Sequence, residues 1–184
     1  MSNENKLSWD ELFITSAVLI SARGSCDRLR TACVLVKNRR IVGTGYNGSV
    51  SGLPSCDDDG VGHLLIDGHC LRTLHGEANA IHNSVADLEG ATAYVVATPC
   101  LDCVKALLQN GVKRIVYVGS YENAKGKNYV EELCRDKAVR LDQWASDVVE
   151  VLKVFQKALA RLQGPGGIFR NLPKLEITMK EVKA

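Results

Sequence analysis

Two short motifs bring together side chains that bind metal ions and move protons. His75 and Glu77 are separated by one residue, and Cys100 and Cys103 lie in the sequence PCLDC (99–103). One imidazole and two thiolates suit a tetrahedral zinc ion that keeps its fourth position open for water. Bound zinc lowers the pKa of that water towards ~7, and a nearby carboxylate that is not a ligand can take up its proton. We therefore expect a catalytic zinc held by His75, Cys100 and Cys103, with Glu77 as the acid–base group.

The segments around these motifs alternate between strand and helix patterns. The β-rich runs ACVLV (32–36) and RIVGTGY (40–46) predict a hairpin, ATAYVVAT (91–98) and RIVYVG (114–119) predict buried strands, and AVRLD (138–142) a fifth strand. A capping box at Ser8 and helical spacing predict a helix over 9–23, and further helices are expected over 77–88, 99–109 and 128–138. This order predicts an α/β fold of three layers, α/β/α, around a mixed sheet of about five strands.

The C-terminal part of the chain predicts one more helix and a tail. The apolar face of this helix would comprise Val148, Val151, Leu152, Phe155, Leu159 and Leu162. The run GPGG (164–167) ends it, and LEITM (175–179) is a candidate edge strand. We expect one zinc-dependent catalytic domain over 1–145, with 146–184 packed on it or at an oligomer interface.

Composition narrows the classes of protein to which the chain can belong. Its 184 residues are 46% hydrophobic and 24% charged, with a formal net charge of +2. Such a composition is typical of a globular domain. A net charge this small gives no strong electrostatic attraction to nucleic acid or to a membrane surface, so neither partner is expected. The first residues lack a secretory pattern, so we expect a cytoplasmic protein. Seven cysteines without an export signal favour metal binding, and Cys33 and Cys134 also fit buried apolar positions.

The H-x-E and P-C-x-x-C motifs together form the zinc deaminase signature. The chain resembles the deoxycytidylate deaminase family, particularly its bacterial late-competence branch, from about Trp9 to about Arg140. The resemblance rests on GTGYNGSVSG (43–52), IDGHCLRTLHGEANAI (66–81) and ATPCLDCVKALLQNGVKRIVY (97–117). It implies hydrolysis of dCMP to dUMP and ammonia, which supplies thymidylate precursors. Gly76 departs from the usual H-A-E, and TAC (31–33) departs from the usual V-G-A.

The resemblance also implies residues that bind the substrate. Asn47 lies where the family approaches the nucleotide sugar or an effector, and Asn79 follows the proton shuttle on its helix. Arg28 and Arg30 lie where the family holds the substrate phosphate, which a guanidinium binds through forked hydrogen bonds. Tyr121 is a candidate for stacking on the base. The alternatives are a helix-surface amide for Asn79, solvated loop charges for the arginines and a cap on the sheet for Tyr121.

Regulation and assembly follow from the same resemblance. Many members are hexamers activated by dCTP and inhibited by dTTP, with the effector near a Gly-Tyr-Asn-Gly turn. That turn is present as Gly45, Tyr46, Asn47 and Gly48, and Mg²⁺ would accompany the bound nucleotide. Because Asn-Gly is also an ordinary turn signal, the turn alone does not establish an effector site.

Residues 47–74 are a long irregular stretch, of a kind that a compact domain seldom contains unless something fixes it. Related deaminases carry a structural zinc here, with ligands from the loop before the first strand and from this insertion. The resemblance implies the ligands Cys26, Cys56, His63 and Cys70, with His69 in reserve. Competence-type sequences have a cysteine about where His63 stands, and both residue types bind zinc. Reduced cysteines in a lid are the alternative.

The same motifs also fit other functions. The same chemistry could act on cytidine, guanine or an RNA base, although aromatic residues make up only 5% of the chain and a polynucleotide editor needs stacking platforms. The chain could also be a non-catalytic scaffold stabilised by zinc. Such a scaffold has no need of Glu77, which is not a ligand.

Overall fold

A five-stranded mixed sheet forms the centre of the computed structural model, which describes residues 6–121, 126–146, 148–174 and 177. Its strands are β1 (Ala32–Lys37), β2 (Arg40–Tyr46), β7 (Thr92–Val96), β8 (Arg114–Val118) and β9 (Arg140–Ala145). They lie in the order β2-β1-β7-β8-β9. β1 pairs antiparallel with both β2 and β7, whereas β7, β8 and β9 are parallel. The prediction of a mixed sheet of about five strands is confirmed.

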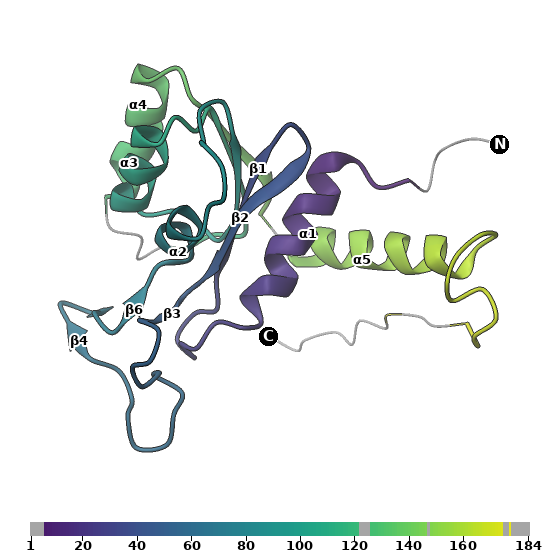
Figure 1. The fold of residues 1–184 in the computed structure, drawn as a ribbon, viewed down its shortest axis with the longest axis horizontal. Helices are drawn as coiled ribbons and strands as arrows, with labels where there is room; N and C mark the ends of the chain where they lie inside the picture. The colour runs from purple at the N-terminus through teal and green to yellow at the C-terminus, as the bar shows by residue number, and fades with distance from the viewer. Residues whose placement is uncertain (1–5, 122–125, 147, 175–176, 178–184) are drawn as a thin grey trace.

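Helices cover both faces of this sheet (Figure 1). One face packs against α1 (Trp9–Ser21) and α5 (Val148–Gln163), and the other against α2 (Gly76–His82), α3 (Leu101–Gln109) and α4 (Lys127–Asp136). The expected three-layer α/β/α arrangement is therefore present. None of the described helices is long and apolar enough to cross a membrane.

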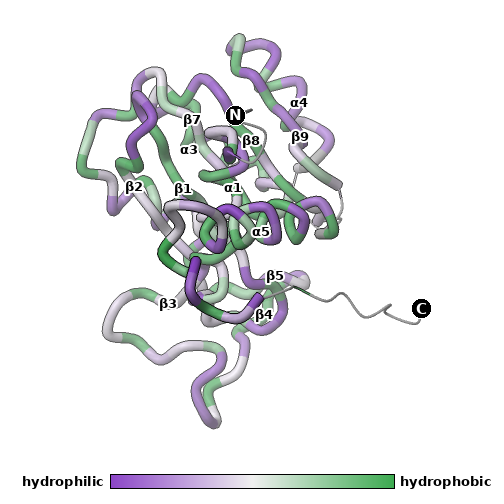
Figure 2. The backbone as a smooth tube through the Cα atoms, turned by 90° about the vertical axis from the view of Figure 1, so that its right-hand side faces the viewer, coloured by the Kyte–Doolittle hydropathy of each residue, from purple (hydrophilic) through white to green (hydrophobic). Residues whose placement is uncertain are grey.

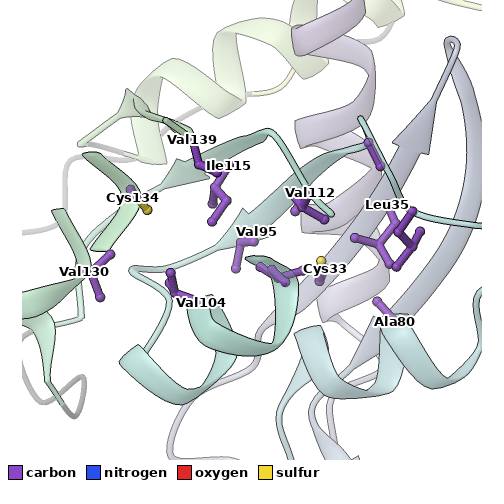
Figure 3. Close-up of a cluster of buried hydrophobic side chains, with 14 residues drawn as sticks. Cys33, Leu35, Ala80, Val95, Val104, Val112, Ile115, Val130, Cys134 and Val139 are labelled. Atoms are coloured by element: carbon purple, nitrogen blue, oxygen red, sulfur yellow. The ribbon is translucent and has the colours of Figure 1, made fainter. Parts of the chain in front are cut away.

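The strands separate two hydrophobic cores because successive side chains point to opposite faces. In β1, Cys33 and Leu35 belong to the core under α2, α3 and α4, whereas Val34 and Val36 belong to the core under α1 and α5. Figure 3 shows Cys33 and Leu35 in the first of these cores, with Ala80 of α2 close by. The hydrophobic stretches of the chain accordingly run through the central strands (Figure 2).

The hairpin between β1 and β2 follows the predicted pattern. Asn38 and Arg39 form its two-residue turn with φ of 51° and 61°. Positive φ at both central residues matches the right-handed twist of the flanking strands. The predicted fifth strand is also present, although it begins at Arg140 and ends at Ala145.

The helix predicted over 77–88 is wrong in its extent, because α2 ends at His82. The Asn83 side-chain amide donates to the carbonyl of Asn79, which satisfies a carbonyl of the last turn. Two residues later, the Val85 amide bonds to the carbonyl of Val42 in β2. The chain after α2 is thus hydrogen-bonded to the edge strand β2, and this tertiary contact overrides the helical pattern. The helix predicted over 9–23 ends slightly earlier than expected, at Ser21.

The C-terminal helix α5 packs across α1 and β9. Val151 and Val154 are buried and Phe155 packs against the same core, whereas Leu162 is 38% exposed, so the predicted face is buried except at its C-terminal end. Lys157 adds an ion pair to Glu11 of α1, with Nζ and Oε1 separated by 3.0 Å. The division at residue 145 stays a prediction. The edge strand predicted over 175–179 lies, apart from residue 177, outside the described residues.

The insertion between β2 and α2 protrudes from the body of the molecule (Figures 1 and 2). It consists of turns and two short ladders. In one ladder β3 (Gly48–Ser49) pairs with β6 (Thr73–Leu74), and in the other β4 (Leu65–Ile66) pairs with β5 (His69–Cys70). The prediction of a long irregular stretch is confirmed, and so little regular structure leaves its side chains to hold it in place.

Candidate active site and second donor cluster

The starts of α2 and α3 bring His75, Cys100 and Cys103 together. His75 and Cys100 are the N-cap residues of the two helices, both in extended backbone conformation. The His75 Nδ1 atom lies 3.3 Å from the Cys103 Sγ atom and 3.5 Å from the Cys100 Sγ atom. All three donor atoms lie within 4.8 Å of one another. The motifs thus meet in space as expected.

These separations fit a tetrahedral zinc ion. With bonds of about 2.0–2.1 Å to nitrogen and about 2.3 Å to sulfur, tetrahedral angles separate two donor atoms by roughly 3.5–3.8 Å. The observed distances from nitrogen to sulfur, 3.3 and 3.5 Å, agree with this value. The donor set of one imidazole and two thiols also leaves a fourth position without a protein ligand.

Glu77 lies in the first turn of α2 beside these donors and is only 4% exposed. Burial raises the pKa of its carboxyl group, because charge is disfavoured away from water. A hydrogen bond from Cys103 lowers the pKa of the Cys100 thiol to about 4. A hydrogen bond to Cys100 raises the pKa of His75. The site therefore places a sulfur donor of lowered pKa beside a buried acid of raised pKa, a combination suited to zinc binding and proton transfer.

Cys33 and Cys134 lie apart from the donor atoms. Cys33 is 0% exposed and Cys134 is 2% exposed, and burial raises the pKa of both thiols. Their interpretation as small buried apolar residues is confirmed.

The Gly-Tyr-Asn-Gly turn packs directly under α2. A Cβ atom on Gly45 would lie 2.2 Å from the Ala80 amide nitrogen, so only glycine permits this approach. Asn79 donates from Nδ2 to the carbonyl of Tyr46 over 2.8 Å. These contacts hold the helix that carries Glu77 against the end of β2.

Asn47 is buried beneath the α1–β1 loop, which spans residues 22–31. Its Oδ1 atom accepts a hydrogen bond from the Thr31 amide over 2.9 Å, and its Nδ2 atom donates to the Leu29 carbonyl over 2.6 Å. The Thr31 hydroxyl in turn donates to the carbonyl of Val96 at the end of β7. The side-chain amide of Asn47 thus fixes the loop onto the sheet.

The remaining predicted substrate residues surround these elements. Arg28 and Arg30 lie exposed in the α1–β1 loop, and Arg30 Nε donates to the Gly24 carbonyl over 3.1 Å. Tyr121 follows β8, and its amide donates to the hydroxyl of Thr98, just before the P-C-x-x-C motif. This bond holds the Tyr121 backbone near the start of α3.

A second cluster joins the α1–β1 loop to the insertion. Donor atoms of Cys26, Cys56 and His63 lie within 4.8 Å of one another. The Cys70 Sγ atom lies 3.6 Å from the Cys56 Sγ atom, which again matches a tetrahedral edge of about 3.8 Å. Among the described residues, neither Cys70 nor His69 has a donor atom within 4.8 Å of all three of Cys26, Cys56 and His63. Since neighbours in a strand point to opposite faces, β5 directs Cys70 and His69 apart.

Asp27 is a residue of this cluster that the sequence analysis missed. Its Oδ1 atom lies 2.8 Å from the His63 Nε2 atom. The only signal in the sequence is its position next to Cys26, because His63 lies far along the chain and follows no periodic pattern.

The fold has three layers, and the His and Cys-x-x-Cys donors lie at two adjacent helix starts beside a buried carboxyl group. This combination defines the class of zinc-dependent, cytidine-deaminase-like enzymes. The family model described as the cytidine and deoxycytidylate deaminase zinc-binding region matches residues 7–119. The chain belongs to this family.

Individual relatives agree with that assignment. The chain is 36% identical to ComE operon protein 2 of Bacillus subtilis (strain 168), over 97% of this chain and 92% of that protein. It is 35% identical to the deoxycytidylate deaminase of Mycobacterium phage D29, over 59% of this chain and 93% of that one. The crystal structure of the dCMP deaminase from cyanophage S-TIM5, in complex with dCMP and dUMP, matches with a TM-score of 0.61 at 27% identity. That match covers 77% of this chain and 98% of the phage chain. The expected family and its late-competence branch are confirmed.

Proposed function

We propose that this protein hydrolyses dCMP to dUMP and ammonia in the cytoplasm and so supplies thymidylate precursors. The family and the similarity to a dCMP deaminase crystallised with dCMP and dUMP support this substrate. The observation that carries the proposal is the triangle of His75, Cys100 and Cys103 donors at zinc-binding distances beside the buried Glu77. A structural zinc site would not need that carboxylate.

The residues of the site suggest a division of roles. His75, Cys100 and Cys103 would hold a zinc ion, which when bound activates water as a nucleophile near neutral pH. Glu77 takes a proton from the attacking water, passes it to N3 of the cytosine ring and delivers the second proton to the 4-amino nitrogen. The amino group leaves as ammonia and the oxygen of water replaces it, so dCMP and one water give dUMP and one ammonia.

Substrate recognition is assigned to the elements around this centre. Arg28 and Arg30 bind the phosphate, and the arrangement of Arg30 supports this because its Nε bond to Gly24 leaves the terminal nitrogens available. Tyr121 stacks on the base and Asn79 supports the pocket, whereas Asn47 affects recognition through the α1–β1 loop, to which its side-chain amide is hydrogen-bonded. The turn formed by residues 45–48 binds a dCTP or dTTP effector with Mg²⁺, and the chain assembles as a homohexamer.

The second cluster is proposed as a structural zinc site with Cys26, Cys56, His63 and Cys70 as ligands. The separations of 3.6 Å between the Cys56 and Cys70 Sγ atoms and 3.9 Å between Cys26 Sγ and His63 Nδ1 support a site with these four ligands. Structural zinc contributes roughly 10–16 kcal/mol of apparent binding free energy. This is comparable to the stability of a whole domain, about 5–15 kcal/mol, and is enough to order the insertion.

Ammonia release from dCMP, deoxycytidine and cytidine, compared between wild type and Glu77→Gln, tests the proposed function. Wild type should prefer dCMP, and Glu77→Gln should lose at least about 100-fold in kcat while keeping its zinc content. Equal rates in the two proteins would contradict the role of Glu77, and a chain inactive on all substrates would be a scaffold. Turnover of cytidine or deoxycytidine without dCMP would keep the chemistry and refute the nucleotide as substrate.

A further inference from the structure

His63 differs from a cysteine ligand because either of its two ring nitrogens could bind the metal in the second cluster. A thiolate has one donor atom, whereas imidazole has two nitrogens, and a metal ligand must expose the lone pair of one while the other carries the proton. In this structure Nδ1 faces the cluster, at 3.9 Å from the Cys26 Sγ atom. Nε2 faces Asp27, at 2.8 Å from its Oδ1 atom. The two nitrogens therefore have different partners.

We propose that Asp27 is a positioning residue, which accepts a hydrogen bond from His63 Nε2–H and so directs the Nδ1 lone pair to the metal. This inference rests on the proposed second zinc. A carboxylate behind a ligating histidine fixes both the tautomer and the orientation of the ring, and it makes the ligand more basic. Asp27 itself touches no metal.

The position of Asp27 in the chain makes the pairing effective. Asp27 directly follows Cys26, so one short stretch supplies both a ligand and the residue that orients another ligand. His63 comes from the insertion, 37 residues after Cys26, and its ring also contacts the Cys70 thiol within the insertion. The Asp27 contact therefore adds a second connection between the α1–β1 loop and the insertion.

Exposure sets the expected size of the effect. The Asp27 side chain is 62% exposed, whereas that of His63 is 22% exposed. Outer-shell partners of metal ligands commonly change metal affinity by about 10–100-fold. Because water screens the exposed carboxylate, we expect the lower value, about tenfold.

Zinc content and affinity test this role without relying on turnover. The zinc affinity of the second cluster is measured by competition with a chromophoric chelator in wild type, Asp27→Ala and Asp27→Asn. Asp27→Ala should weaken binding about tenfold. Asp27→Asn should recover part of the loss, because its amide oxygen still accepts from Nε2–H. Asp57→Ala is the matched control, since it removes an exposed acid next to the ligand Cys56 and should leave the affinity unchanged.

The decisive comparison places Asp27→Ala in a His63→Cys background. A cysteine ligand needs no choice of tautomer, so there the loss of Asp27 should change zinc affinity by less than about twofold. In the Co²⁺-substituted protein, His63→Cys should also add thiolate charge-transfer absorption, which identifies the site being measured.

Two outcomes would overturn the role of Asp27. Wild-type affinity in Asp27→Ala would remove it, and an equal loss in the His63→Cys background would show that Asp27 acts on the loop rather than through the imidazole. One zinc per wild-type chain would refute the second site, and the role of Asp27 with it. Because dCMP turnover is recorded on the same wild-type preparation, failure of the second site is distinguishable from failure of the proposed activity.

Discussion

Gly76 determines how closely the catalytic helix approaches the sheet. It lies between His75 and Glu77, and a Cβ atom there would lie 2.9 Å from the Ala32 Cα atom and 3.2 Å from the Gly45 carbonyl oxygen. The family that the chain resembles has alanine in place of Gly76 and glycine in place of Ala32. The departure at position 76 is therefore a matter of packing between the start of α2 and the backbone at the start of β1.

This contact predicts that Gly76→Ala destabilises the protein by about 1–3 kcal/mol, because backbone atoms must move to admit the methyl group. The shift would also displace His75 and Glu77, so kcat should fall together with stability. Ala32→Gly should restore part of both losses, because the start of β1 can then yield. A double-mutant cycle in urea denaturation should give a coupling of at least about 0.5 kcal/mol. Strictly additive effects would show that the two positions are independent.

At the scale of elements, the α1–β1 loop combines a proposed ligand of the second metal site with the arginines proposed to bind the substrate phosphate. It carries Cys26 towards the second cluster and Arg28 and Arg30 towards solvent. Its position depends on Asn47, whose side-chain amide bonds to two backbone groups of the loop. Asn47 can therefore affect phosphate recognition without touching the phosphate.

We expect Asn47→Ala to raise KM for dCMP more than KM for deoxycytidine, because the loop arginines lose their support while a nucleoside does not use them. Stability should fall by about 1–3 kcal/mol, since buried backbone groups lose their partners. Steady-state kinetics on both substrates distinguish this role from direct contact with the sugar, which would raise both KM values equally. Asn110→Ala, which removes an exposed bond to the Ala106 carbonyl, is the control and should leave both KM values unchanged.

The same elements indicate which parts of the structure can be predicted from sequence. The hairpin, the buried strands and the two zinc motifs follow from local patterns, because alternation and motif spacing involve neighbours in the chain. The end of α2 does not, because it is determined by the bond between Val85 and Val42 across the sheet edge. The pairing of Asp27 with His63 is equally non-local, and no periodicity in the insertion indicates it.

At the scale of the whole molecule, the carboxyl ends and the amino ends of the parallel strands have different roles. The P-C-x-x-C motif and Tyr121 follow the carboxyl ends of β7 and β8, where ligands bind in open α/β sheets. At the amino ends of these strands, Arg114 is the first residue of β8 and donates two hydrogen bonds of 2.8 Å to the Asp10 carboxylate of α1. Arg114 Nε also donates to Asp142 of β9 over 2.7 Å. One guanidinium thus joins a helix and two strands away from the catalytic edge.

This network predicts a pH-dependent contribution to stability. The bonds from Arg114 lower the pKa of Asp10 below its usual value, and the Tyr94 hydroxyl adds a further bond of 2.7 Å. A carboxyl group whose pKa is depressed by folding stabilises the protein above its unfolded pKa of about 3.9, and the effect is lost as pH falls through the folded pKa. At pH 7, Asp10→Asn should therefore lower the free energy of unfolding by about 1–2 kcal/mol.

Urea denaturation of wild type and Asp10→Asn from pH 7 down to about pH 3 measures this contribution. The difference between the two proteins should begin to shrink below pH ~4, where the unfolded carboxyl group becomes protonated, and should continue to shrink towards the lower pKa of folded Asp10. Loss of metal in acid affects both proteins and cancels in the difference. Asp87→Asn removes the exposed pair with Lys37, at 2.9 Å, and should change stability little at any pH because water screens that pair. A difference between wild type and Asp10→Asn that stayed constant with pH would mean that Asp10 acts through shape and hydrogen bonding rather than through its charge.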